Sequence, residues 1–174
     1  DERREGMLKR VRTAALEIAY EETGSSGGPA VVLLHGFPYD VRAYDGVVAR
    51  LAPRCRLLVP YLRGYGQTRF LSPHALRSGQ QAALGTDLLG FLDALGVDQA
   101  IVGGYDWGGR AACIVSALWP EPGPWAGLGE GVTPPQEPSP RFTVLRGHQV
   151  VSGAGHDLPQ EAPDAFASAV LALL

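Results

Sequence analysis

Asp106 and His156 are the two residues of this chain whose types and surroundings are best suited to nucleophilic chemistry. Asp106 lies at the centre of Gly104-Tyr-Asp-Trp-Gly-Gly109, between a short apolar run and an expected helix. The spacing Gly-x-nucleophile-x-Gly is typical of a nucleophile elbow, a sharp strand-to-helix turn. Such a turn tolerates only small flanking residues, which is the role expected of Gly104 and Gly108. The pattern predicts Asp106 as a nucleophile; the alternative is an aspartate that only caps a helix N-terminus.

The segment His35-Gly-Phe-Pro38 directly follows another short apolar run and is a second candidate. Loops that leave the carboxyl ends of central parallel strands are where such sheets place their sites. We expect the backbone N–H of Phe37 to be one oxyanion donor and that of Trp107 to be the other. We interpret His35 as a hydrogen-bonded loop residue, with Gly36 and Pro38 supporting the motif.

His156 ends the segment Gly153-Ala-Gly-His, which lies between an expected short strand at 149–151 and the last expected helix. A histidine on a loop at the carboxyl end of a strand is a candidate general base. A lone histidine is otherwise often a surface residue. His156 lies late in the chain, after Asp106. This agrees with the order of nucleophile and histidine in hydrolases that are built on a mainly parallel sheet. We therefore predict His156 as the base.

Hydrophobic patterning predicts the elements that must position these residues. Continuous apolar runs are typical of strands buried on both faces of a sheet, and they occur at 30–34, 55–59 and 100–103. Residues 11–20 alternate like a half-buried strand. Helices are expected at 47–51, 79–95 (with Gly96 as its cap), 110–118 and 162–174. This alternation predicts an α/β fold with a mainly parallel sheet flanked by helices.

Residues 120–141 interrupt this pattern. Seven prolines and four glycines lie between positions 120 and 140, without a β-branched apolar run. Periodicity therefore predicts no strand in this Pro/Gly-rich junction.

Composition narrows the function classes. The 174 residues are 45% hydrophobic and 19% charged, which suits a single domain over 1–174, with 1–6 interpreted as an upstream remnant. A net charge of −3 gives no reason to expect a nucleic-acid partner, and no apolar run reaches the roughly 18–20 residues of a membrane span. Two distant cysteines are interpreted as reduced thiols, which favours a cytoplasmic location. No metal-ligand spacing or phosphate loop occurs, so no cofactor or metal is expected.

Taken together, these motifs resemble the α/β-hydrolase superfamily, and within it the branch of epoxide hydrolases and haloalkane dehalogenases. HGFP at 35–38 resembles the HG-x-P oxyanion motif of that branch, and GYDWGG at 104–109 resembles its Asp-Trp elbow. GAGHDLPQEAPDAFASAVLALL, from 153 to the end, is similar to its histidine loop and closing helix. The run 62–66 resembles its R-G-x-G turn, with Tyr61 where Asp is usual. The resemblance covers residues 8–120 and 142–174.

The resemblance implies a two-step reaction. Asp106 would attack an electrophilic carbon to give an alkyl-enzyme ester, and water activated by His156 would hydrolyse that ester. The indole N–H of Trp107 would stabilise a halide or a neighbouring polar group. Glu130 is the candidate for the acid that orients His156, with Glu in place of the usual Asp. The implied substrate is a small, apolar-bodied epoxide or alkyl halide.

The chain also departs from this branch. Relatives carry a helical cap after the sixth strand, whereas here the cap is lacking and the sixth and seventh strands are not recognisable. No Tyr follows Tyr105 to take the role of the cap tyrosines. One explanation is an internally deleted hydrolase, which we expect to be prone to aggregation, dimeric or inactive. The other is that residues of a longer parent are omitted near 120–127 and 136–142. We favour the second, because losing two central strands would leave unpaired sheet edges.

Two other functions stay open from the sequence. One is a non-catalytic binding module of α/β-hydrolase type that holds a small apolar ligand. The other is a capless esterase, which is less natural because an aspartate nucleophile would form an anhydride with an ester substrate.

Overall fold

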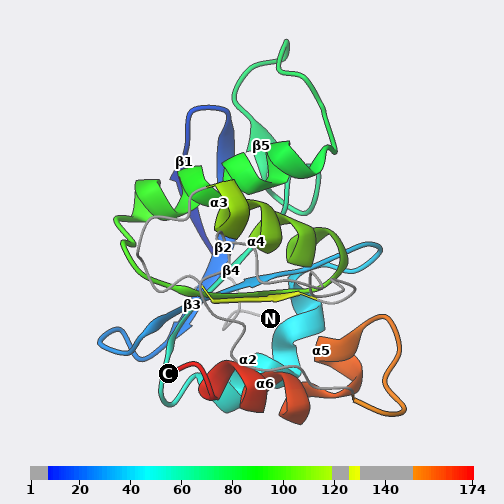
Figure 1. The fold of residues 1–174 in the computed structure, drawn as a ribbon. Helices are drawn as coiled ribbons and strands as arrows, with labels where there is room; N and C mark the ends of the chain where they lie inside the picture. Colours follow the sequence, from blue (N-terminus) through cyan, green and yellow to red (C-terminus); the bar gives the residue numbers. More distant parts are fainter. Residues whose placement is uncertain (1–7, 119–125, 130–150) are drawn as a thin grey trace.

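The computed structural model describes residues 8–118, 126–129 and 151–174. Its centre is a mixed sheet in which the strands are ordered β1-β2-β4-β3-β6-β7, with the short β5 paired to β2 (Figure 1). The strands are β1 (Leu8–Arg12), β2 (Leu16–Gly24), β3 (Ala30–Leu34), β4 (Arg56–Pro60), β5 (Arg69–Phe70), β6 (Ile101–Gly104) and β7 (Ala126–Gly129). Strands β4, β3, β6 and β7 run parallel, whereas β1, β2 and β5 pair antiparallel. The predicted α/β fold with a mainly parallel sheet is confirmed.

Helices cover both faces of this sheet. The helical segments are η1 (Val41–Tyr44, a 3-10 helix), α2 (Asp45–Leu51), α3 (Gln81–Leu95), α4 (Asp106–Leu118), α5 (Leu158–Glu161) and α6 (Pro163–Leu171). Helices α3 and α4 lie together on one face, and α2 and α6 lie together on the other (Figure 1). Helix α3 ends as predicted at Gly96, which is left-handed with φ +62° and donates its N–H to the carbonyls of Leu92 and Asp93.

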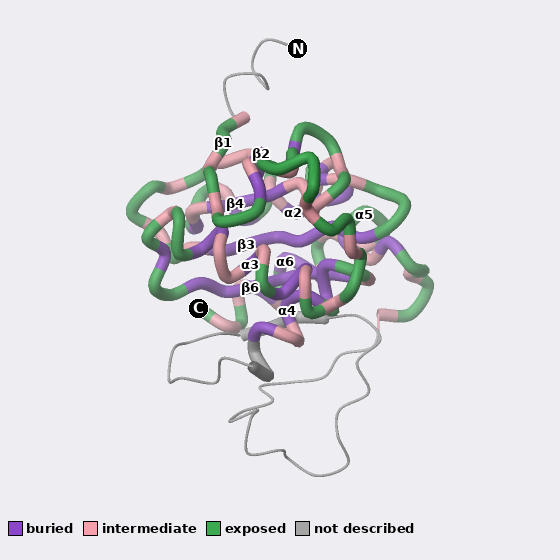
Figure 2. Tube along the Cα trace, turned by 90° about the horizontal axis from the view of Figure 1, so that it is seen from above, coloured by how far each residue is buried: buried purple, intermediate pink, exposed green. Residues whose placement is uncertain are grey.

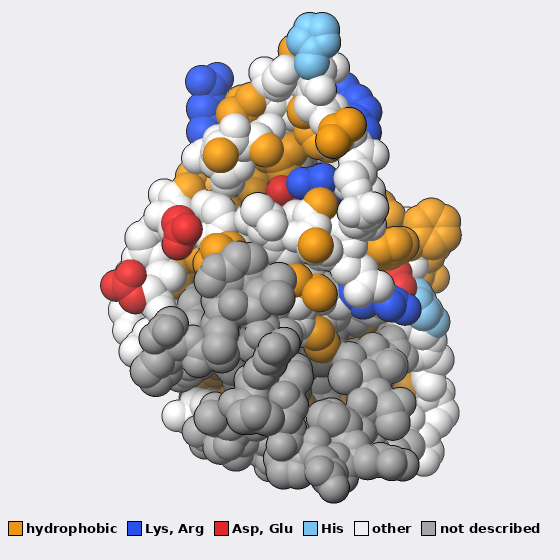
Figure 3. Space-filling model, turned by 45° about the horizontal axis from the view of Figure 1, so that its top comes forward, with side chains coloured by type: hydrophobic (Ala, Val, Ile, Leu, Met, Phe, Trp, Pro, Cys, Tyr) orange, Lys and Arg blue, Asp and Glu red, His pale blue; other side chains and the backbone are white. Residues whose placement is uncertain are grey.

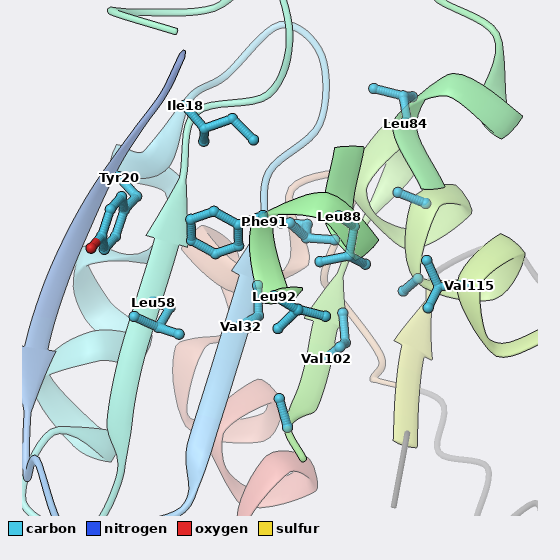
Figure 4. Packing of buried hydrophobic residues seen from close by; sticks show 14 of the residues in the cluster. Ile18, Tyr20, Val32, Leu58, Leu84, Leu88, Phe91, Leu92, Val102 and Val115 are labelled. Atoms are coloured by element: carbon cyan, nitrogen blue, oxygen red, sulfur yellow. The ribbon is translucent and has the colours of Figure 1, made fainter. Parts of the chain in front are cut away.

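The central strands separate two hydrophobic cores. Strands β3 and β6 are buried along nearly their whole length (Figure 2). On one face, Phe91 and Leu92 of α3 pack against Val32, Leu58 and Val102 of the sheet (Figure 4). The other face holds a second cluster that α2 and α6 cover. Burial on both faces is the reason for the continuous apolar runs in the sequence.

The N-terminal pattern is a hairpin, not the single strand expected over 11–20. Thr13 breaks the strand: its N–H donates to the carbonyl of Leu16 at 2.8 Å, and its Oγ1 accepts from the N–H of Leu16 at 3.1 Å. Short polar side chains that bond to nearby backbone favour turns in this way. The predicted alternation holds only in part within β2: Leu16, Ile18 and Tyr20 are buried, but Ala19, expected on the opposite side, is buried as well.

The expectation of no strand within 120–141 is wrong. Strand β7 pairs in parallel with β6, from Ile101 opposite Ala126 to Gly104 opposite Gly129. Ladder hydrogen bonds come from the backbone, so the small residues of Ala126–Gly129 pair without any apolar periodicity. The rest of the junction lies outside the described residues, as do 149–150 of the expected short strand; Val151 belongs to neither helix nor strand.

Two helix boundaries also differ from expectation. Helix α4 begins at Asp106 rather than Arg110, so the elbow aspartate is itself the first helical residue. The single last helix expected over 162–174 is the shorter α6, and a separate helix, α5, precedes it. Proline at the first position of α6 marks the break between the two helices. Within the described residues, the helices are all too short or too polar to cross a membrane.

Candidate active site

Asp106 occupies a strained turn at the carboxyl end of β6. Its φ of +48° is the only positive φ of a non-glycine residue in the described part of the chain. Such a conformation is costly for an L-residue and persists only where the surroundings enforce it. The turn joins β6 to α4 through Tyr105 alone, so the Asp106 carboxylate stands at the N-terminus of a helix.

Three glycines allow the backbone to close around Asp106. A Cβ at Gly108 would lie 2.0 Å from the carbonyl oxygen of Leu34, and one at Gly104 would lie 2.6 Å from the carbonyl carbon of Gly108. A Cβ at Gly36 would lie 2.6 Å from the Cβ of Asp106. Because the atoms met at Gly104 and Gly108 are backbone atoms, they cannot swing aside.

The loop after β3 contacts the Asp106 carboxylate directly. The backbone N–H of Phe37 donates to Asp106 Oδ2 at 2.8 Å, and the Phe37–Pro38 peptide bond is cis. This N–H is the donor that the sequence places in an oxyanion site. Trp107 follows in the first turn of α4, where backbone N–H groups have no partner within the helix.

His35 is fully buried in the same loop, and both of its ring nitrogens have partners. The backbone N–H of Leu62 donates to Nε2 at 3.1 Å, and Nδ1 lies 3.2 Å from the carbonyl oxygen of Gly36. Nε2 is thus an acceptor, which assigns the proton to Nδ1. Burial lowers the pKa of His35 and favours this neutral form. His35 therefore ties the β3 loop to the segment after β4 and is not free to act as a base.

His156 lies across from Asp106. Its Nε2 is 3.9 Å from Asp106 Oδ1, the carboxylate oxygen that does not accept from Phe37. The ring of His156 meets the ring of Tyr105 edge to face, with centroids 5.7 Å apart. The side chain of His156 is 56% exposed, so water reaches the imidazole. Glu130, the predicted acid partner of His156, lies outside the described residues.

A buried polar pair lies beneath these residues, and sequence reasoning missed it. The Tyr105 hydroxyl and the Asp157 carboxylate are buried side by side, and neither has a hydrogen-bond partner of good geometry among the described residues. Burial raises the pKa of Asp157 and that of Tyr105. Nothing in the apolar periodicity marks Asp157, because a charged residue after a loop histidine usually faces solvent.

Three large aromatic side chains are exposed on the two segments that meet at Asp106. Phe37 is 59% exposed, Tyr39 is 43% exposed and Trp107 is 37% exposed. Exposed large apolar groups gathered at one place mark a binding surface more often than scattered ones do. Among the described residues on the face drawn in Figure 3, by contrast, basic and acidic side chains are scattered and form no patch of either sign. Within the described ranges, no group of three or more His, Cys, Asp or Glu side chains is placed to hold a metal ion.

The chain is similar to proteins of a known family. Residues 29–122, more than half of the chain, match the family model described as alpha/beta hydrolase fold. Human epoxide hydrolase 4 is 31% identical over 112 residues, which are 64% of this chain and 30% of the human protein. Epoxide hydrolase A of Mycobacterium tuberculosis is 34% identical over 99 residues, which are 56% of this chain and 30% of that protein.

A solved structure is similar as well. A Klebsiella pneumoniae protein assigned as an epoxide hydrolase is 45% identical and superposes with a TM-score of 0.65, covering 69% of this chain and 40% of that one. The chain thus spans well under half the length of the relatives that it matches.

Proposed function

This chain belongs to the α/β-hydrolase fold family, and from that premise we propose that it hydrolyses epoxides through an ester formed on Asp106. The observation that carries the proposal is the difference between the two oxygens of Asp106. Oδ2 accepts from the N–H of Phe37, whereas Oδ1 faces His156 at a distance too long for a hydrogen bond. Oδ1 therefore keeps its lone pairs available for attack.

In the first step Asp106 Oδ1 attacks an epoxide carbon. One C–O bond of the ring breaks, and the ring oxygen, still bonded to the other ring carbon, takes a proton from water and leaves hydroxide. Oδ2 becomes the carbonyl oxygen of the new ester and stays on the N–H of Phe37. Asp106 stands at the start of α4, where its side chain is placed to act as the nucleophile.

In the second step His156 acts on water. Nε2 takes a proton from a water molecule, whose oxygen attacks the ester carbonyl carbon. The negative charge that develops on Oδ2 is stabilised by the N–H of Phe37 and by the N–H of Trp107 at the helix N-terminus. As this intermediate collapses, its bond to Oδ1 breaks and the departing Oδ1 takes the proton from Nε2, which releases a diol that carries the original Oδ1. The oxygen of water remains on Asp106, whose carboxyl proton passes to the hydroxide left by the first step.

The substrate that fits this site is a small epoxide with an apolar body. Phe37, Tyr39 and Trp107 offer exposed apolar surface on the two segments that meet at Asp106, and two of the similar proteins named above are epoxide hydrolases. An alkyl halide would enter the same first step with halide as the leaving group, so it serves as the competing substrate in the test.

The experiment is an intact-mass measurement on a His156→Ala variant incubated with styrene oxide or with a bromoalkane. Removing the base blocks the second step but not the first, so the protein gains the mass of one epoxide molecule, and peptide mapping places it on Asp106. Asp106→Asn/His156→Ala is the matched control and gains no mass. No adduct on a folded His156→Ala protein, or the same adduct on the control, contradicts the proposal.

A further inference from the structure

Glu161 reaches back from the end of α5 to the loop that carries His156. Its Oε2 accepts from the backbone N–H of Gly155 at 2.8 Å, and its Oε1 accepts from the backbone N–H of Asp157 at 3.2 Å. These N–H groups belong to the residues directly before and after His156. One carboxylate thus holds both neighbours of the histidine, with one oxygen for each.

The loop is shaped so that this approach is possible. A Cβ at Gly155 would lie 3.0 Å from Oε1 and 3.2 Å from Oε2 of Glu161, closer than nearly all real Cβ contacts. Gly153, two residues earlier, has φ +81°, a conformation that other residues seldom adopt. Both glycines allow the backbone to fold down onto the carboxylate.

Helix α5 returns Glu161 to this position. The N–H groups of Gln160 and Glu161 both donate to the carbonyl oxygen of Asp157, at 3.0 and 2.9 Å. Backbone bonds therefore tie residues 157–161 into one turn, and the Glu161 side chain closes that turn onto Gly155. His156 is left as the projecting side chain of a closed loop.

We propose that Glu161 is a positioning residue that holds the backbone N–H groups of the residues before and after His156 and so sets where the imidazole stands relative to Asp106. The inference rests on the proposed function, in which His156 acts only in the second step, the hydrolysis of the ester. Hydrogen bonds from amides to an ionised carboxylate are the stronger kind, and small displacements of a catalytic group are costly. The loss of Glu161 therefore slows hydrolysis of the ester and leaves its formation unchanged.

The test is Glu161→Gln, measured in single turnovers with styrene oxide. A glutamine oxygen can accept from one of the two amides, but its NH₂ group faces the other donor without a bond. We expect the ester to form at the wild-type rate and to decay roughly tenfold to a hundredfold more slowly. Asp164→Asn is the matched control: Asp164 lies three residues on and pairs with exposed Arg50 instead of the loop, so both steps keep their wild-type rates.

A readout that needs no activity accompanies the kinetics. In proton–nitrogen correlation spectra, Glu161→Gln is expected to shift the amide protons of Gly155 and Asp157 upfield, to speed their exchange with solvent, and to weaken the nuclear Overhauser contact between His156 and Tyr105. Unchanged amide resonances overturn the inference, as does wild-type ester decay in Glu161→Gln. If no ester forms even with His156→Ala, the proposed function fails, and the loss or retention of the His156–Tyr105 contact in Glu161→Gln still decides whether Glu161 positions the histidine.

Discussion

The two oxygens of Asp106 differ in their surroundings because of three residues on two separate loops. Phe37 supplies an amide to Oδ2, His156 stands opposite Oδ1, and Gly36 leaves room for the side chain between them. A carboxylate bound on one oxygen and free on the other is suited to attack with the free oxygen. At this scale the chemistry depends on backbone groups as much as on side chains.

A substitution at Gly108 tests how closely the turn around Asp106 is packed. We expect Gly108→Ala to lower the stability by about 1–3 kcal/mol or more, because the added methyl group would lie 2.0 Å from the Leu34 carbonyl oxygen. Gly79→Ala is the matched control, since a Cβ there meets no atom within 4 Å. Thermal unfolding followed by circular dichroism compares the two, and equal melting temperatures would show that the elbow is not closely packed.

The sequence located several of these residues but not all of them. Gly-x-Asp-x-Gly and HGFP named Asp106, Phe37 and the small residues, since a sharp turn restricts residue type. Glu161 was missed because it acts through hydrogen bonds to peptide groups, which leave no trace in periodicity. The catalytic roles of Asp106 and His156 stay predictions, although the structure brings the two side chains to 3.9 Å.

At the scale of elements, Glu22 of β2 links its two neighbouring strands. Its carboxylate accepts from Lys9 of β1 at 2.9 Å and from Arg56 of β4 at 2.7 Å. Burial alone would raise the pKa of Glu22, but the hydrogen bonds and charges of Lys9 and Arg56 outweigh it and lower that pKa below 4.5. The folded state therefore binds this proton less readily than the unfolded chain does.

Because the pKa of Glu22 is lower in the folded state, the free energy of unfolding depends on pH. The stabilisation by Glu22 is complete above the ordinary pKa of 4.5 and is lost as the pH falls through the lowered folded value. We expect Glu22→Gln to cost up to about 1 kcal/mol at pH 7, because these side chains are partly exposed, and to cost nothing at strongly acid pH. Urea unfolding across this range measures the difference. Glu17→Gln, on the same strand with a largely exposed partner in Arg12, is the control. If Glu22→Gln lowered the free energy of unfolding by the same amount at all pH values, the lowered pKa of Glu22 would be contradicted.

Elements differ in how far the sequence predicts them. Strands β3, β4 and β6 were predictable because burial on both faces demands continuous apolar runs. The hairpin between β1 and β2 was not, since the side-chain bonds of Thr13 override an unbroken alternation. Strand β7 was missed because pairing with β6 depends on backbone groups and not on side-chain type.

At the scale of the whole molecule, one sheet supports two cores that must fold together. Leu33 and Leu34 are neighbours in β3, yet Leu33 is buried in the cluster beneath α2 and α6, and Leu34 in the cluster beneath α3 and α4. We expect Leu33→Ala and Leu34→Ala each to cost about 2–5 kcal/mol, in one cooperative transition. Coincident unfolding curves from tyrosine and tryptophan fluorescence and from far-ultraviolet circular dichroism would bear this out. A biphasic curve in either variant would show that the two faces unfold separately.

Two loops of the candidate site leave the same edge of this sheet. Asp106 follows β6, and Phe37 follows β3, its parallel neighbour. Because parallel strands place their carboxyl ends side by side, residues almost 70 positions apart in the sequence meet at hydrogen-bond distance. Fold class could be derived from the sequence for this reason, whereas β7 could not, since the prolines and glycines around it give no periodic signal.

The most direct test of the account is a single turnover of styrene oxide in water labelled with oxygen-18, with enzyme in excess. If Asp106 forms the ester and water attacks its carbonyl carbon, the diol carries unlabelled oxygen from Asp106, and the label appears in the Asp106 carboxylate. If the label appears in the diol and Asp106 remains unlabelled, water attacks the epoxide directly and the central claim is wrong.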